Sequence, residues 1–232
     1  MLINYIIVIL HTHYIIIGMA KLKNKNDEDK KDSIKKPCNY MGNTFFTKDV
    51  KQAIEVMRQG GVILYPTDTI WGLGCDATNE KAVERIYQIK QRNESKAMIC
   101  LVDSENRLSR YVRNIPHVAW DLFECSVRPT TLILDGATGL ANNLIAEDGS
   151  VAMRITNDLF SKELCYRFQK PIVSTSANIS GQPAPQLFKD ISDEILKSVD
   201  YICTSRREEK RKHSPSCIIK LASDGEVQII RM

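Results

Sequence analysis

Short apolar runs and amphipathic helical patterns follow one another irregularly along most of this chain, and this mixture limits the fold more than any other feature. The run Val62-Ile63-Leu64-Tyr65 has the length and composition of a buried strand. The segment from 80 to 90 instead carries apolar residues at helical spacing, among them Val83 and Ile86. Strands mixed with helices in this way predict an α/β (α+β) domain built on a mixed β-sheet.

The same two patterns predict the other elements. We expect helices over residues 48–59, 80–90, 116–125, 158–168 and 192–199. We expect strands over residues 62–65, 97–102, 130–134, 151–155, 172–174, 201–203, 216–220 and 227–230. The run from Pro66 to Gly74 is expected to be a loop.

The first 43 residues differ from the rest of the chain. Residues 2–17 are apolar but are interrupted by Asn4 and the run His11-Thr12-His13, and a highly charged stretch follows over residues 21–36. The apolar segment makes a poor signal peptide and is shorter than the roughly 20 residues of a membrane helix. We expect residues 1–43 to be an extension that is disordered or outside the fold, and residues 44–232 to be one folded domain. A weak membrane anchor, or a genuine strand or helix, is the alternative for residues 2–17; no stable membrane association is expected.

Charge and cysteine content exclude some classes of protein. The formal net charge of +4 over 232 residues suits a polyanionic ligand but is lower than in most dedicated nucleic-acid-binding domains. The seven cysteines include no C-x-x-C pair of the kind used in zinc and redox sites. They indicate reduced thiols and a cytoplasmic protein.

Two polar loops follow predicted strands. Pro66-Thr67-Asp68-Thr69 offers two hydroxyls and a carboxylate, which could fix a small polar ligand or could satisfy their own backbone in an Asx or ST turn. The run from Ser174 to Gly181 carries many short polar side chains, which could donate to an anion or could cap a helix ahead of a turn. It is not a Walker loop, because the chain has no G-x-x-x-x-G-K-[ST] motif.

Cationic side chains stand at two further places. Lys90, Arg92 and Lys96 cluster in a polar loop that enters a predicted strand, where they could clamp a triphosphate or simply be solvated. Arg154 lies within the apolar strand 151–155, where an unpaired charge would cost several kcal/mol. It must therefore either form a structural ion pair or face an anionic ligand, and the sequence favours neither.

Taken in order, these segments resemble the YrdC-like family over roughly residues 44–232. The family's motifs stand here as Tyr65 to Gly74, Lys90-Gln91-Arg92 with Lys96, Pro129 to Leu134, Val151 to Ile155, Ser174 to Gly181, and Pro215-Ser216-Cys217. The resemblance implies a single YrdC-like domain of the short form, with a twisted mixed β-sheet, flanking helices and a concave basic cleft.

The resemblance also implies an activity. Enzymes of the family are nucleotidyltransferases that join L-threonine, bicarbonate or CO2, and ATP into threonylcarbamoyl-AMP and pyrophosphate. Other proteins then transfer the threonylcarbamoyl group to an adenosine of certain tRNAs, a step of tRNA processing. No protein nucleophile and no protein-held metal is implied; Mg2+ is expected to accompany ATP.

Site residues follow from the same resemblance. Thr69, Arg154 and Ser216 match positions that hold L-threonine. The positions that match nucleotide contacts are Lys90, Arg92, Lys96, Ser150, Ser176, Asn178 and Arg231. We expect Asp68 to act only indirectly, and Tyr65 and Trp71 to form walls of the pocket.

The chain departs from the family pattern at Asn93, at Val127-Arg128, at Thr156 and at Cys217. The basic loop from Ser205 to His213 replaces a turn that is often glycine-rich; we expect a solvated surface there, with contact to phosphate or tRNA as the alternative.

Two other functions are open to such a domain. One is a non-catalytic RNA-binding module with weak affinity for tRNA through a concave basic surface. The other is the carbamoyl-transfer domain of hydrogenase maturation, which is disfavoured because the chain has no room for the acylphosphatase and zinc-finger regions that accompany it.

Overall fold

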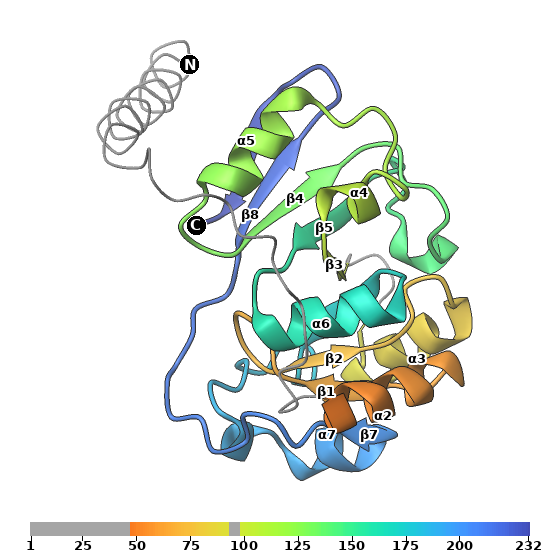
Figure 1. Ribbon diagram of the computed structural model, residues 1–232, viewed down its shortest axis with the longest axis vertical. Helices are drawn as coiled ribbons and strands as arrows, with labels where there is room; N and C mark the ends of the chain where they lie inside the picture. The colour runs from red at the N-terminus through yellow and green to blue at the C-terminus, as the bar shows by residue number, and fades with distance from the viewer. Residues whose placement is uncertain (1–46, 93–97) are drawn as a thin grey trace, which may run out of the picture. The chain divides into compact units, whose positions relative to one another are not determined.

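A nine-stranded mixed sheet organises the protein, seen here in a computed structural model that describes residues 47–92 and 98–232 (Figure 1). The described residues all fall within one compact unit, Asn43–Met232. In sheet order the strands are β7 (Tyr201–Ile202), β1 (Ile63–Tyr65), β2 (Gly72–Gly74), β6 (Ile172–Ser176), β3 (Ile99–Val102), β5 (Val151–Ile155), β4 (Thr130–Leu134), β8 (Cys217–Leu221) and β9 (Val227–Arg231). The predictions for residues 1–43 lie outside the described residues.

Three strand pairs are parallel, and this makes the sheet mixed, as predicted. β1 runs parallel to β7, β3 to β5, and β4 to β8, whereas the other neighbours are antiparallel. Parallel neighbours need long crossover connections. Helices supply most of them, which is why strands and helices alternate along the sequence.

The helices are α2 (Thr47–Arg58), α3 (Glu80–Lys90), α4 (Glu105–Leu108), α5 (His117–Cys125), α6 (Leu159–Phe168) and α7 (Asp193–Ser198), with 3-10 turns η1 (Asn142–Leu144) and η2 (Phe188–Asp190). Figure 1 shows α2, α3, α6 and α7 around the half of the sheet that contains β1, β2 and β7, while α5 lies along β4 and β8. The five longer predicted helices are confirmed within two residues at each end. Helix α4 and the 3-10 turns were not predicted.

One prediction was wrong: the end of the expected loop from Pro66 to Gly74 is a strand. Gly72–Gly74 pairs with β1 on one side and β6 on the other. A Cβ at Gly74 would lie 2.6 Å from the Tyr65 ring and 2.9 Å from the Val173 carbonyl oxygen, so only glycine fits there. Because glycine has a low strand propensity, the sequence pattern concealed this central strand.

The cysteines of the described residues are unpaired, as expected from the sequence. The six cysteines of residues 47–92 and 98–232 are free. Burial raises the pKa of Cys100 to about 12, as expected for a thiol that packs as a small hydrophobe. No helix in these same residues has the length and apolar character that a membrane span requires.

Candidate functional site

A polar cavity of about 230 Å³ is the place where most of the predicted binding residues meet. Six of the ten line it: Thr69, Arg92, Arg154, Ser176, Ser216 and Arg231. They come from loops and strands that are separated by up to 162 positions in the sequence, since 231 − 69 = 162. Trp71 also lines the cavity, as predicted.

The register of the sheet explains how these residues share one face. Ser176 stands opposite Gly72, Ile99 opposite Ser174, and Arg231 opposite Ile218, and all six residues line the cavity. Residues directly opposite each other in neighbouring strands point to the same side of a sheet. Each pair therefore presents both of its residues to the same face, and Arg231 of the edge strand β9 meets residues of β2, β3 and β6 at the cavity.

Arg154 is the most deeply buried charged residue of the cavity, with 2% of its side chain exposed. Its Nη2 lies 3.0 Å from Oδ1 of Asp68. Within the described residues, neither this carboxylate oxygen nor the Nε of Arg154 makes a hydrogen bond of good geometry. Arg154 and Asp68 thus form an ion pair, and the guanidinium still has N–H groups that can donate to a further anion.

The sequence left a structural ion pair and a ligand contact open for Arg154, and the structure gives it the pair while leaving it on the cavity wall. Burial raises the pKa of the Asp68 carboxyl, and the nearby Arg154 opposes that rise. Asp68 does not line the cavity. Its indirect role, expected from the sequence, is therefore to partner the arginine.

Ser216 is held by two neighbours. Its hydroxyl lies 3.0 Å from the Thr131 hydroxyl and accepts from Nη2 of Arg231 at 3.3 Å. Nε of Arg231 also donates to the Ser216 carbonyl at 3.0 Å. Thr131 is fully buried and was missed by the sequence analysis, although it lies in the family motif Pro129 to Leu134.

Thr69 owes its position to a local turn. The Thr67 hydroxyl accepts from the Thr69 backbone N at 3.1 Å, lies 2.9 Å from the Thr69 hydroxyl and donates to the Ile70 carbonyl at 2.7 Å. Of the two alternatives that the sequence left open for this loop, the structure shows the turn, and the ligand contact stays a prediction. Thr67 forms the ST turn, and the turn places Thr69 on the cavity wall.

Arg92 and Ser176 also line the cavity. Helix α3 ends at Gln91, whose backbone is left-handed at φ 50°, and the chain then turns so that the Arg92 N donates to the Tyr87 carbonyl. Burial lowers the pKa of Arg92, though arginine stays charged. Ser176 is the last residue of β6.

Two predicted nucleotide residues support this region without lining the cavity. Lys90 is buried, and its Nζ donates to the carbonyl oxygens of Ser176 at 2.5 Å and Asn178 at 2.7 Å. Burial lowers its pKa to about 8. The Asn178 amide donates to the carbonyls of Ile179 and Gln182. Both side chains therefore fix the loop after β6.

The remaining predicted residues lie elsewhere. Ser150 is buried in the turn before β5, where its backbone N donates to Asp148, and it does not line the cavity. Lys96 lies outside the described residues. Tyr65, expected as a pocket wall, is instead fully buried in the core, because it donates to the Val173 carbonyl and packs against Gly74.

The basic loop 205–213 is solvated only in part: Glu208, Lys210, Arg211 and Lys212 are exposed, as expected, whereas two of its arginines make contacts within the protein. Arg206 donates to the Thr67 carbonyl and to Asp158, and Arg207 lies 5.0 Å over the ring of Phe188. Buried Asp49 accepts from the backbone N of Thr204 and of Ser205. Asp49 and Asp158, the carboxylates that bind this loop, are distant from it in sequence, so these contacts could not be predicted.

Carboxylates and other metal ligands are sparse around the cavity. Across the described residues, no group of three or more His, Cys, Asp or Glu side chains could hold a metal ion. The cavity is lined by hydroxyls, guanidinium groups and apolar side chains. This donor set fits anions rather than a protein-held cation.

Several known proteins are similar to this chain. The family model named Sua5_yciO_yrdC, described as "Telomere recombination", matches residues 55–232. A curated relative, the threonylcarbamoyl-AMP synthase of Pseudoalteromonas translucida, is 37% identical over 155 residues, which cover 66% of this chain and 83% of the relative.

Two solved structures are also similar. P. abyssi Sua5 complexed with L-threonine matches with a TM-score of 0.66 and 26% identity, over 74% of this chain and 50% of that chain. The chain thus spans about half the length of that protein. E. coli YciO matches with a TM-score of 0.69 and 27% identity, over 79% of this chain and 88% of that one. The chain belongs to the Sua5/YciO/YrdC family.

Proposed function

We propose that this protein is an L-threonylcarbamoyladenylate synthase, which forms threonylcarbamoyl-AMP and pyrophosphate from L-threonine, bicarbonate or CO2, and ATP. The observation that carries the proposal is the meeting of Thr69, Arg154 and Ser216 on one cavity with Arg92, Ser176 and Arg231. The relative from Pseudoalteromonas translucida bears the name of this activity, and P. abyssi Sua5 was solved with L-threonine.

L-Threonine fits the buried end of the cavity. Arg154 keeps donor capacity beyond its contact with Asp68 and is suited to the amino acid's carboxylate, a charge-assisted interaction. The hydroxyls of Thr69 and Ser216 can bind the polar groups of a small ligand. Both are already oriented by Thr67 and Thr131, so binding costs little reordering.

ATP fits the more open side, where Arg92 and Arg231 add positive charge. The cavity's volume of about 230 Å³ is below the usual range of about 300–1,000 Å³, so a bound nucleotide would extend beyond it. Lys96 is a proposed ATP contact on the basis of the family motif alone. Lys90 and Asn178 would act by fixing the loop that carries Ser176.

The reaction requires alignment more than covalent catalysis. The threonine nitrogen bonds to the carbon of CO2 and loses a proton, and an oxygen of the resulting carbamate attacks the α-phosphorus of ATP. The bond from that phosphorus to the bridging oxygen breaks, and pyrophosphate leaves. The arginines neutralise charge that develops on phosphate oxygens, and the buried hydroxyls orient the amino acid.

Mg2+ is proposed to arrive with ATP and be held by phosphates and water. The cavity's own side chains do not suit the ion, because they supply guanidinium groups and hydroxyls and no cluster of carboxylates within the described residues. Proteins that transfer the threonylcarbamoyl group to tRNA are the proposed downstream partners, and the cytoplasm is the proposed location because ATP and tRNA are there.

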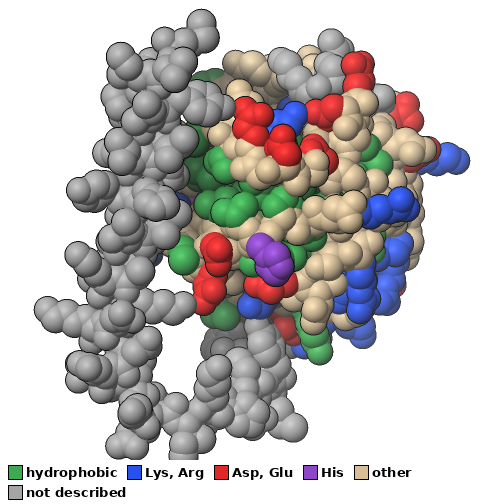
Figure 2. Space-filling model, turned by 90° about the horizontal axis from the view of Figure 1, so that it is seen from above, with side chains coloured by type: hydrophobic (Ala, Val, Ile, Leu, Met, Phe, Trp, Pro, Cys, Tyr) green, Lys and Arg blue, Asp and Glu red, His purple; other side chains and the backbone are tan. Residues whose placement is uncertain are grey.

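The test is ATP–pyrophosphate exchange that depends on both L-threonine and bicarbonate. We expect exchange to vanish when either is left out. The alternative, a non-catalytic RNA-binding module, predicts no exchange together with salt-sensitive RNA binding. On the face in Figure 2, acidic and apolar side chains occupy much of the surface and the Lys and Arg side chains gather toward one edge, so this face offers no continuous basic surface for RNA.

A further inference from the structure

We propose that Arg206 is a positioning residue for the L-threonine end of the cavity, which it controls through the loop Pro66-Thr67-Asp68-Thr69. This inference rests on the proposed function. Arg206 does not line the main cavity and so would not touch the substrate. It lines the smaller neighbouring hollow, which shares Thr69 and Trp71 with the main cavity.

The Arg206 guanidinium joins three segments. Its Nη1 donates to the Thr67 carbonyl at 3.1 Å and to Oδ1 of Asp158 at 2.8 Å, and its Nη2 lies 2.7 Å from Oε2 of Glu209. Only 22% of the Arg206 side chain is exposed. A planar group with five donors can hold several acceptors at fixed angles, which a lysine ammonium cannot do in the same way.

Asp158 extends this arrangement into α6. Its Oδ2 caps the helix by accepting from the backbone N and the hydroxyl of Ser161, both at 2.9 Å. The Ser161 hydroxyl also lies 3.3 Å from the Pro66 carbonyl, as the longer branch of a hydrogen bond that it shares with Asp158. The carbonyls of Pro66 and Thr67 are therefore both tied to the network that Arg206 completes.

Through the loop Pro66-Thr67-Asp68-Thr69, Arg206 also fixes residues that line the cavity. Thr67 is fixed at its carbonyl by Arg206, and its hydroxyl holds the backbone and side chain of Thr69. Asp68, between them, is the ion-pair partner of Arg154. Two of the three proposed threonine contacts thus depend on the placement of one short loop.

The backbone of Arg206 gives a second, independent reason. Its φ is +63°, in the left-handed region where a side chain is unfavourable and glycine is preferred. The chain holds an arginine there at a conformational cost, which the ion pairs offset. Buried Asp49 anchors the preceding Thr204 and Ser205, so the loop enters Arg206 from a fixed point.

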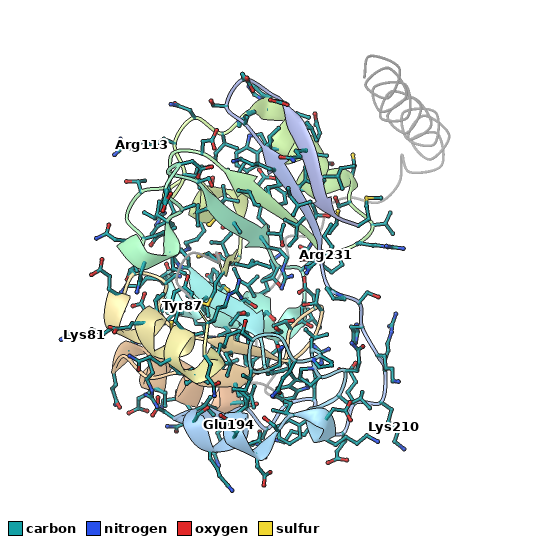
Figure 3. All side chains as sticks on the ribbon, turned by 180° about the vertical axis from the view of Figure 1, so that it is seen from behind. Lys81, Tyr87, Arg113, Glu194, Lys210 and Arg231 are labelled. Atoms are coloured by element: carbon teal, nitrogen blue, oxygen red, sulfur yellow. The ribbon has the colours of Figure 1, made fainter. Side chains whose placement is uncertain are left out.

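The experiment compares Arg206→Ala, Arg206→Gly and Lys210→Ala in steady-state synthesis of threonylcarbamoyl-AMP. Lys210 is an exposed cation of the same loop and lies at its outer edge (Figure 3). We expect the alanine and glycine variants to raise KM for L-threonine about 10- to 100-fold, as loss of a charged hydrogen bond would, with KM for ATP within about twofold. Lys210→Ala should match the wild type.

Three results would overturn the proposal. Full activity in Arg206→Gly, with Arg206→Ala impaired, would mean that the side chain only offsets the strain of its own backbone. Equal increases in KM for threonine and ATP would indicate general loss of structure. A threonine KM that changes as much in Lys210→Ala would indicate an effect of net charge.

Amide hydrogen exchange measures the positioning role of Arg206 without relying on enzymatic activity. We expect Arg206→Ala to speed exchange at the Thr69 amide, which donates to Thr67, about 10-fold or more, with Lys210→Ala unchanged. A wild type without synthase activity would defeat the proposed function while exchange still tests the positioning. Unchanged exchange at Thr69 in Arg206→Ala would refute the positioning role whatever the activity.

Discussion

The two ends of the cavity are built differently. At the proposed threonine end, Thr69, Arg154 and Ser216 are buried, with 6%, 2% and 2% of their surface exposed. At the proposed nucleotide end, Arg92 and Ser176 are half-buried and Arg231 is exposed. Figure 3 shows Arg231 between the upper and lower parts of the structure, whereas Lys81 and Lys210 lie at its outer edges.

The difference lies in how each end can bind its ligand. Each buried group is held by a named neighbour: Thr69 by Thr67, Arg154 by Asp68 and Ser216 by Thr131. Such a site is preorganised and selects a small ligand that matches it. Arg92 and Arg231 at the other end have longer and more exposed side chains, whose individual contacts with a triphosphate are weaker in water. The Arg231 side chain is held there by its hydrogen bonds to Ser216.

The largest expected effect comes from Arg154→Ala. Its loss leaves Asp68 buried without a counter-charge, so we expect the free energy of unfolding to fall by about 3–5 kcal/mol and threonine affinity to fall by about 100-fold or more. Chemical denaturation and calorimetry measure the two quantities.

The double variant Asp68→Asn with Arg154→Ala separates the two effects. It removes the uncompensated charge, so much of the stability should return while threonine binding stays weak. Threonine affinity close to that of the wild type in the double variant would show that Arg154 does not bind L-threonine.

Arg92→Ala should affect the other end. We expect KM for ATP to rise about 10- to 100-fold and the Kd for L-threonine to stay within about twofold, because Arg92 is a proposed ATP contact whose guanidinium suits phosphate oxygens. Kinetics at saturating threonine measure the first and calorimetry without ATP the second. Arg58→Ala, in the last turn of α2, is the matched control on an exposed surface. A larger change for threonine than for ATP would reverse the assignment of the two ends.

The pH dependence of stability tests whether buried Lys90 holds the loop that carries Ser176. Its pKa is about 8 in the folded protein and near 10.5 ordinarily, so between these values the unfolded chain binds more protons. The free energy of unfolding should therefore rise with pH from 8 toward 10.5, by at most about 1.4 kcal/mol per unit.

Urea denaturation at several pH values, with Lys90→Met beside the wild type, isolates this contribution. Lys90→Met should lack the rise and lose the hydrogen bonds to Ser176 and Asn178, whereas Lys81→Ala, an exposed residue of α3, should keep the rise. Identical pH profiles in Lys90→Met and the wild type would contradict the shifted pKa.

Arg231→Ala should have the smallest effect. The side chain is exposed, and Ser216 keeps its contact with Thr131 when Arg231 is lost, so we expect KM for ATP to rise only about three- to tenfold. Arg113→Ala, on the outer surface, should be silent (Figure 3). An effect of Arg231→Ala as large as that of Arg154→Ala would show that the open end is as tightly organised as the buried one.

Much of the fold could be predicted from the sequence, because most elements carry a clear period of apolar residues. α3 matches its predicted bounds, residues 80–90, since Asn79 caps it and its apolar face is unbroken. Strand β2 could not be predicted, because Gly72–Gly74 owes its strand conformation to β1 and β6 on either side rather than to its own residues.

The candidate site divides in the same way. Sequence motifs predicted that Thr69, Arg92, Arg154, Ser176, Ser216 and Arg231 act together, and the structure places them on one cavity. Motifs could not distinguish residues whose side chains line the cavity from residues whose side chains hold its loops in place. Lys90 and Asn178 lie in the same motifs, yet their side chains bind the backbone of the loop after β6.

The sequence by itself determined the order of most strands and helices and the chemical types of the site's residues, because both are largely local properties of the chain. Only the tertiary structure decided which of these residues meet and which partner each one has. Arg206 shows the reason most clearly: its acceptors, at Thr67 and Asp158, lie 139 and 48 positions away. Contacts at such separations depend on strand order and register, and no local pattern of side chains carries that information.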